Sequence, residues 1–216
     1  MRVVIAGGHG QIALRLTRLL AGDGDEAVGL VRSPDHVADI EAAGGRGIVL
    51  DLEHADVPAV AAELAGADAA VFAAGAGPGS GAARKDTVDR AAAELFAKAA
   101  EDAGVRRHLQ VSGMGLDRAD DPGIEPVFAA YLKAKRAAED DLRGRDLDWT
   151  IVRPGRLTDE PGTGRVRLAD SVRRGSVSRD DVAAVLVALL TAPGSVGRTL
   201  ELVGGDTPIA DAITSL

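Results

Sequence analysis

The stretch Arg2-Val3-Val4-Ile5-Ala6-Gly7-Gly8-His9-Gly10-Gln11-Ile12-Ala13 decides the fold of this chain. It opens with three consecutive β-forming residues, an apolar run that fits a buried parallel strand and ends at a cluster of glycines. From Gln11 to Ala21, apolar residues recur mostly three or four positions apart, which predicts an amphipathic helix. A strand, a glycine turn and a helix in direct succession form the first half of a nucleotide-binding βαβ unit.

The glycines of this turn fit two spacings that nucleotide-binding proteins use. Gly8, Gly10 and Ala13 match G-x-G-x-x-G/A, whereas Gly7, Gly10 and Ala13 match G-x-x-G-x-x-G/A. A phosphate group needs a close approach to the backbone, and the helix that begins at Gln11 points its free N–H groups and positive dipole end towards that phosphate. A plain tight turn is the alternative, because 27 glycines in the chain make accidental matches common.

The composition limits which classes of protein and which partners are possible. With 216 residues, 46% of them hydrophobic, the chain can bury one substantial core, and a second full domain is not expected. A net charge of −8 argues against nucleic acid and anionic membranes as partners. No apolar run approaches the roughly 20 residues of a membrane span and no cationic signal segment precedes the first strand, so we expect a cytoplasmic protein.

The metal-binding residue types give no pattern. The chain has no cysteine, which excludes disulfides, thiolate nucleophiles and thiolate metal sites. Its four histidines are scattered without the i, i+4 pairing of a helical metal site. We therefore expect no metal, and we assign His9 to the predicted phosphate turn.

A basic residue follows the second predicted strand, Ala27 to Val31. In this kind of fold an acidic residue there bonds the adenosine ribose hydroxyls, whereas a basic residue neutralises a 2′-phosphate. Arg32 therefore predicts NADP in preference to NAD, the alternative being a solvated residue at a strand end. A third strand, Gly47 to Leu50, is followed by Asp51 and Leu52, a position from which a carboxylate could reach an adenine amino group.

A run of very small residues follows the fourth predicted strand, Asp68 to Phe72. The side chains from Ala73 to Gly81 are too small to pack, which lets the backbone run close to a ligand beside the first glycine turn. A flexible linker is the alternative reading. The strand before the segment and the helical pattern between Ala83 and Ala103 argue against it.

Tyr131 and Lys135 form a second motif, on a helix predicted from about Glu125 to Arg143. Residues four apart share a helix face, so the phenol and the ammonium can enter one cleft. A nearby cation is expected to lower the phenol pKa from about 10, which suits a proton donor to a carbonyl oxygen. Lys135 could also donate to a nicotinamide ribose. An amphipathic tyrosine on a surface helix is the alternative, although the chain has one tyrosine and only four lysines.

Together with the stretch Leu147–Gly155, these motifs resemble the atypical short-chain dehydrogenase/reductases over nearly the whole chain. The resemblance implies one Rossmann domain spanning residues 1–216, a doubly wound α/β fold of about seven parallel strands in the order 3-2-1-4-5-6-7 with helices on both faces. It implies that NADP lies across the carboxyl ends of the strands, that Tyr131 and Lys135 are the acid and its helper, and that residues 153–178 shape the substrate side. Motifs and resemblance together predict cofactor contacts from Gly7, His9, Gly10, Gln11, Ile12, Arg32, Asp51, Leu52, Ala73, Ala74, Gly75, Ser112, Lys135 and Pro154.

One position departs from the family pattern. In extended members a Ser or Thr just after the fifth strand polarises the substrate carbonyl, whereas here the strand His108 to Val111 is followed by Ser112-Gly113-Met114. Ser112 aligns one or two places before the expected position. Losing one oxyanion donor costs about 10²- to 10³-fold in rate, so the departure bears on catalysis and not on cofactor binding.

Three functions fit these observations. The first is an NADPH-dependent oxidoreductase of a small carbonyl, quinone, flavin or tetrapyrrole compound. The second is an NADP(H)-binding sensor that acts through a protein partner. The third, a sugar-nucleotide epimerase or dehydratase, is disfavoured because the chain is short for the substrate domain such enzymes add. The sequence leaves the oligomeric state open, and several arginines of the substrate side could either attract an anionic substrate or form a solvated face: Arg156, Arg165, Arg167, Arg173 and Arg174.

Overall fold

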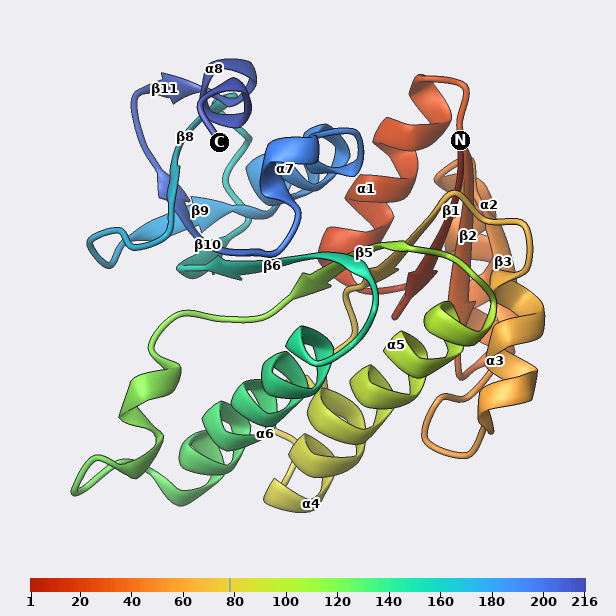
Figure 1. Cartoon of the computed structure of the whole chain (residues 1–216), viewed down its shortest axis with the longest axis horizontal. Helices are drawn as coiled ribbons and strands as arrows, with labels where there is room; N and C mark the ends of the chain where they lie inside the picture. Colours follow the sequence, from red (N-terminus) through yellow and green to blue (C-terminus); the bar gives the residue numbers. More distant parts are fainter. Residues whose placement is uncertain (78) are drawn as a thin grey trace.

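The computed structural model describes residues 1–77 and 79–216, and its centre is a mostly parallel sheet (Figure 1). Within the described residues the sheet has nine strands in the order β11-β8-β10-β6-β5-β4-β1-β2-β3, and a separate small sheet pairs β7 with β9. The strands are β1 (Arg2–Ala6), β2 (Glu26–Val31), β3 (Arg46–Val49), β4 (Ala69–Phe72), β5 (Arg107–Val111), β6 (Asp148–Pro154), β7 (Arg156–Thr158), β8 (Arg165–Ala169), β9 (Ser176–Ser178), β10 (Arg198–Gly204) and β11 (Thr207–Pro208).

Helices alternate with these strands along most of the chain. They are α1 (Gln11–Gly22), α2 (Val37–Ala42), α3 (Val57–Leu64), α4 (Ala82–Arg84), α5 (Ala92–Asp102), α6 (Pro126–Arg143), α7 (Arg179–Leu190) and α8 (Ile209–Thr214), with short helical turns η1 (Pro34–His36), η2 (Lys85–Ala91), η3 (Leu116–Asp120) and η4 (Pro193–Ser195). Of these turns, η2 is π-helical, a rare form that often occurs at functional sites.

The parallel strands run in the order β3-β2-β1-β4-β5-β6-β10, which confirms the predicted doubly wound order. The seven parallel strands agree with the predicted number, and β8 and β11 extend the edge beyond β10 through antiparallel pairings. The strands β7, β9 and β11 have only two or three residues each. The alternation of apolar and polar residues that marks a strand cannot be recognised in so few positions. Much of residues 153–178 is therefore strand and not loop.

Two helical layers cover the sheet, one on each face (Figure 1). On one face α1 and α7 pack together, and their buried Leu16 and Leu186 join the β-strand side chains in one core. On the other face α3, α5 and α6 cover a second core that includes Phe72 and Phe96. Strands buried on both faces explain the nearly continuous apolar runs of β1 and β4.

The strand order reverses between β1 and β4, which lie side by side. The chain leaves β1 towards α1 on one face and leaves β4 towards α5 on the other. In doubly wound sheets such a reversal opens a crevice at the carboxyl ends of the strands, where ligands bind. The glycine turn after β1 and the small-residue segment after β4 both lie at this edge.

The glycine turn also crosses β2 at very short range. A Cβ added to Gly8 would lie 2.6 Å from the Cα of Gly29, a distance that real side chains do not adopt. The Gly8 N–H donates to the Leu30 carbonyl at 3.0 Å, which holds the turn against the strand. Two glycines thus allow the turn to sit directly on the sheet.

We expect Gly8→Ala to destabilise the fold by about 1–3 kcal/mol, because the added methyl forces the turn away from β2. Gly22→Ala is the matched control, since a Cβ there meets nothing within 4 Å and helix propensity favours alanine. Urea denaturation measures both variants. Equal stability of the two would contradict the close packing of Gly8.

Candidate functional site

The turn between β1 and α1 presents backbone and not side chains. Gly7 has a φ of +76°, a conformation that strongly favours glycine, and the Gly10 N–H donates to the Gly7 carbonyl at 2.8 Å. Helix α1 starts after Gly10 with no side-chain cap and no acidic residue in its first turn. Its positive end is thus free of a competing carboxylate, which suits an anion. Gln11 is exposed and bonds Arg15, and the Ile12 side chain packs in the core, so either residue would meet a phosphate through its N–H.

The segment after β4 lies directly against this turn. A Cβ on Gly7 would come within 2.6 Å of the Cα of Ala74, and one on Gly10 would lie 3.7 Å from the Ala73 carbonyl oxygen. The structure therefore places the two small-residue segments side by side, as the sequence predicted. Within 73–81, residue Pro78 lies outside the described residues.

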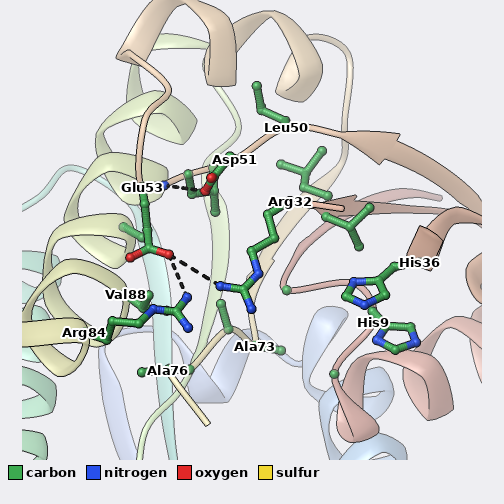
Figure 2. Close-up of a pocket in the computed structure, with 18 residues that line it drawn as sticks. His9, Arg32, His36, Leu50, Asp51, Glu53, Ala73, Ala76, Arg84 and Val88 are labelled. Atoms are coloured by element: carbon green, nitrogen blue, oxygen red, sulfur yellow. Dashed lines mark hydrogen bonds and ion pairs between the residues drawn. The ribbon is translucent and has the colours of Figure 1, made fainter. Parts of the chain in front are cut away.

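A cavity of about 250 Å³ opens between these segments and the ends of β2 and β3 (Figure 2). It is lined by most of the residues predicted to contact the cofactor: Gly7, His9, Gly10, Arg32, Asp51, Leu52, Ala73, Ala74 and Gly75. Residues that sequence reasoning did not select complete the lining: Leu30, Val31, His36, Leu50, Glu53, Ala76, Arg84, Val88 and Ala92. Five predicted contacts stand outside it: Gln11, Ile12, Ser112, Lys135 and Pro154.

Two arginines converge on one carboxylate at the wall of this cavity (Figure 2). The guanidinium of Arg84 lies 2.7 Å from Glu53, and that of Arg32 lies 3.8 Å from the same oxygen. Thr87 donates to the other oxygen of Glu53 at 2.7 Å. The hydrogen bonds from Arg84 and Thr87 hold the pKa of Glu53 below its ordinary value. Arg32 makes only the longer of these two contacts and is half exposed, so its guanidinium is accessible to a ligand.

Asp51 belongs to the same wall. Its carboxylate accepts from the Glu53 N–H and contacts the His54 ring, each at 3.0 Å. Burial alone would raise the pKa of Asp51, but these hydrogen bonds outweigh burial and lower it. Asp51 is therefore ionised at neutral pH.

The two histidines of the lining form a stacked pair beside the glycine turn (Figure 2). The rings of His9 and His36 lie parallel with centroids 3.8 Å apart, and Nε2 of His9 lies 2.7 Å from the carboxylate of Asp39. This contact positions His9 at the edge of the predicted phosphate site. Within the described residues, no group of three or more histidine, aspartate and glutamate side chains is arranged to hold a metal ion.

Lys135 is buried behind the small-residue segment. Its Nζ lies 3.2 Å from the carboxylate of Asp89 and within 3.5 Å of the carbonyl oxygens of Ala74 and Val111. These acceptors stand at the ends of β4 and β5 and on η2. Sequence reasoning missed Asp89, because a lone acidic residue on a helical pattern has no distinguishing signal.

Tyr131 lies one turn before Lys135 on α6. A Cβ on Gly113 would come within 2.9 Å of the phenol oxygen, and the ammonium of Lys85 lies 5.6 Å from the ring centroid. The expected lowering of the phenol pKa was wrong. Burial, with Asp89 and Glu139 nearby, raises the pKa of Tyr131 to about 12. The ammonium of Lys135, which was expected to lower this pKa, is already paired with Asp89.

Ser112 belongs to a buried ionic network and does not line the cavity. Its hydroxyl donates to Glu139 at 2.6 Å, and Glu139 also accepts from Arg143 and from both ends of the Arg153 fork. The network ties α6 to β5 and β6. Pro154 ends β6, and its carbonyl accepts from the N–H of Met114 in the loop after β5. Ser112 thus contacts α6, and Pro154 contacts the loop after β5.

The arginines predicted on the substrate side do not act as one group. Arg165 donates to the carbonyl of Asp206 at the β8 edge. Arg174, in contrast, is exposed and reaches the loop after β5, because a Cβ on Gly115 would lie 2.7 Å from its guanidinium. Gly115 stands two residues from Gly113, the glycine that faces the phenol oxygen of Tyr131, so Arg174 contacts the same loop.

A known protein family matches most of the chain. The model of a family described as NAD(P)H-binding matches residues 7–193, from the glycine turn through α7. The chain belongs to this family. The match includes the turn, the segment after β4, and the helix of Tyr131 and Lys135, and it confirms the resemblance to atypical short-chain dehydrogenase/reductases.

Relatives span the whole chain. The Bacillus subtilis protein YhfK, described as an uncharacterised sugar epimerase, is 36% identical over 217 residues that cover both proteins completely. A Bacillus halodurans structure, provisionally described as an NAD-dependent epimerase/dehydratase, is 36% identical with a TM-score of 0.91 and full coverage of both chains. The structure of the oxidoreductase YlbE from Lactococcus lactis is 26% identical with a TM-score of 0.84, covering 100% of this chain and 96% of that one. The family is thus one of NAD(P)H-binding oxidoreductases and epimerases. As for membranes, none of the helices described for this chain combines the length and apolar character of a span.

We expect Arg84→Met to cost about 1 kcal/mol of stability near pH 7, where the arginine pairs with ionised Glu53. Because the folded-state pKa of Glu53 is lowered, its stabilisation is present above the ordinary value of 4.5 and is lost as pH falls below it. The cost should therefore shrink towards pH 3.5, as measured by urea denaturation at both pH values. Arg46→Met, at an exposed position on β3, is the control. A cost independent of pH would show that the pairing with Glu53 contributes nothing.

Proposed function

We propose that this protein is an NADP(H)-dependent oxidoreductase that reduces a small carbonyl, quinone, flavin or tetrapyrrole compound, with Tyr131 as proton donor. One chain of contacts carries the proposal. Gly7 of the glycine turn faces Ala74, and the Ala74 carbonyl bonds Lys135, one helical turn from Tyr131. The acid therefore stands beside the glycine-lined crevice and not on a separate surface.

The residues present fit a dinucleotide. Gly7 and Gly10 line the cavity without side chains, which suits a ligand that approaches the backbone closely. The pyrophosphate would lie at the first turn of α1, and the adenosine end would lie along the wall of Arg32, Asp51 and Arg84. The nicotinamide end would then extend towards Lys135 and Tyr131. When bound, the cofactor supplies the hydride.

The chain's own residues supply the proton. With its pKa raised to about 12, Tyr131 stays a neutral phenol throughout the physiological range and can donate to a substrate oxygen. Gly113 leaves the space beside the phenol oxygen free of a side chain. Ser112 donates to Glu139, so it does not replace the missing oxyanion donor.

The relatives favour a second candidate, an epimerase. Two relatives that this chain matches over their full length carry that description and are as short as this chain. The short chain, which disfavoured an epimerase in the sequence analysis, is therefore no argument against this activity. An epimerase that removes and returns a hydride consumes no cofactor overall. Net oxidation of NADPH therefore separates the reductase from the epimerase, and cofactor binding without either reaction would identify a sensor.

Tyr131→Phe is expected to slow substrate-dependent NADPH oxidation by about 10²- to 10⁴-fold, because it removes the proton donor and keeps the ring. The measurement is loss of NADPH absorbance with a panel of carbonyl, quinone, flavin and tetrapyrrole compounds. NADPH affinity, measured by calorimetry, should change little. Unchanged turnover in the variant would remove Tyr131 from the mechanism.

Arg32→Asp tests the proposed preference for NADP. A charge-assisted contact with a 2′-phosphate contributes about 1.5–3 kcal/mol, so NADPH affinity should fall roughly 10- to 100-fold while NADH affinity changes little. Isothermal titration with both coenzymes gives the ratio, and Arg46→Asp serves as a control for added negative charge. Equal losses for NADPH and NADH would show that Arg32 does not contact the phosphate.

A further inference from the structure

The wall of the cavity beside Arg32 carries charges of both signs. Of the described residues that line the cavity, two are arginines, Arg32 and Arg84, and two are carboxylates, Asp51 and Glu53. Against the effect of burial, hydrogen bonds hold the pKa of each carboxylate below its ordinary value, so both are ionised at neutral pH. The formal charges of these four side chains cancel. How well the wall attracts a phosphate therefore depends on where its anions stand.

Glu53 is the carboxylate that stands against Arg32 (Figure 2). One of its oxygens lies 3.8 Å from the guanidinium of Arg32 and 2.7 Å from that of Arg84. Its other oxygen accepts from the hydroxyl of Thr87 at 2.7 Å. The side chain of Glu53 is 19% exposed, whereas that of Arg32 is 54% exposed. Two short hydrogen bonds thus hold the carboxylate in place, on the inner side of an arginine that a ligand can reach.

Asp51 is placed differently. Its carboxylate accepts from the N–H of Glu53 and contacts the ring of His54, each at 3.0 Å. Both contacts lie within its own turn after β3. Among the described residues, the carboxylate that pairs with Arg32 is that of Glu53. Glu53 is therefore the anion whose charge acts most directly on Arg32.

We propose that Glu53 is a specificity-determining residue of the coenzyme site: its fixed carboxylate opposes a 2′-phosphate at Arg32 and limits the preference for NADP over NAD. The inference rests on the proposed function only for the place of the 2′-phosphate beside Arg32. A phosphate there is attracted by the guanidinium and repelled by the carboxylate behind it. NADH has a hydroxyl in place of this phosphate, so its binding does not include the repulsion.

The test uses two short ligands that carry only the adenosine end of the coenzymes, 2′,5′-ADP and 5′-AMP. They differ by the 2′-phosphate, so the ratio of their dissociation constants reports that group without any hydride transfer. Isothermal titration at low salt measures both. In Glu53→Gln we expect 2′,5′-ADP to bind about three- to tenfold more tightly, because the repulsion is removed while the amide oxygen can still accept from Thr87. The affinity for 5′-AMP should change little.

Two further measurements separate charge from structure. Glu41→Gln makes the same chemical change at an exposed residue of α2 outside the cavity, and should leave both affinities unchanged. Salt at about 0.5 M screens charges that solvent reaches, so the gain in affinity of Glu53→Gln for 2′,5′-ADP should shrink there. A purely structural role of Glu53 in shaping the wall would not give a gain that depends on salt.

The proposal is overturned if folded Glu53→Gln binds 2′,5′-ADP no more tightly than the unaltered protein, or if 5′-AMP gains as much. Weaker binding of 2′,5′-ADP would also overturn it, because Glu53 would then be orienting Arg32 for the phosphate. Should Glu53→Gln alone not fold, Arg84→Met is compared with the double variant of Arg84→Met and Glu53→Gln. The double variant must then bind 2′,5′-ADP more tightly than Arg84→Met.

Turnover and this binding test separate the two proposals. A protein that fails to oxidise NADPH, yet gains affinity for 2′,5′-ADP in Glu53→Gln, would contradict the proposed reductase and retain the role of Glu53. A protein that oxidises NADPH and shows no such gain would retain the reductase and reject the role of Glu53.

Discussion

The site depends on contacts between main chains at the carboxyl edge of the sheet. Gly7 meets the backbone of Ala74, and Gly8 meets that of Gly29, at distances where a side chain has no room. These contacts join the turn after β1 to the neighbouring strands on both sides. The first turn of α1 that follows has no side-chain cap and no acidic residue. The same absence of side chains that permits the packing therefore creates the place for an anionic ligand.

Buried charges then set the position of α6 against this edge. Lys135 with Asp89 ties the helix to the ends of β4 and β5, and Glu139 with Arg153 ties it to β6. Buried ion pairs add little net stability, because desolvation offsets most of their attraction. Their geometric requirement is strict, however, since an unsatisfied buried charge is expensive. We infer that these pairs fix where Tyr131 stands more than how stable the domain is.

How well the sequence predicts each feature depends on how far apart in the chain the interacting residues lie. The helix Pro126–Arg143 and the strand order could be predicted, because they rest on local periodicity and on a resemblance that spans the chain. The contact of Arg84 with Glu53 could not be predicted, because the two residues are 31 positions apart and neither belongs to a motif. The direction of the Tyr131 pKa was missed for the same reason. It depends first on burial of the phenol, and then on Asp89 and Glu139, which only the folded chain brings near it.

The raised pKa of Tyr131 also bears on proton transfer to the substrate. A forming alkoxide is a much stronger base than a phenolate, so proton transfer from a phenol of pKa about 12 to a reduced carbonyl remains downhill. The reverse reaction needs the phenolate as a base, and at neutral pH that form is scarce. The pairing of Lys135 with Asp89 removes the one charge that would have made it common. With Tyr131 as the acid, the arrangement therefore keeps the proton donor in its protonated form at neutral pH.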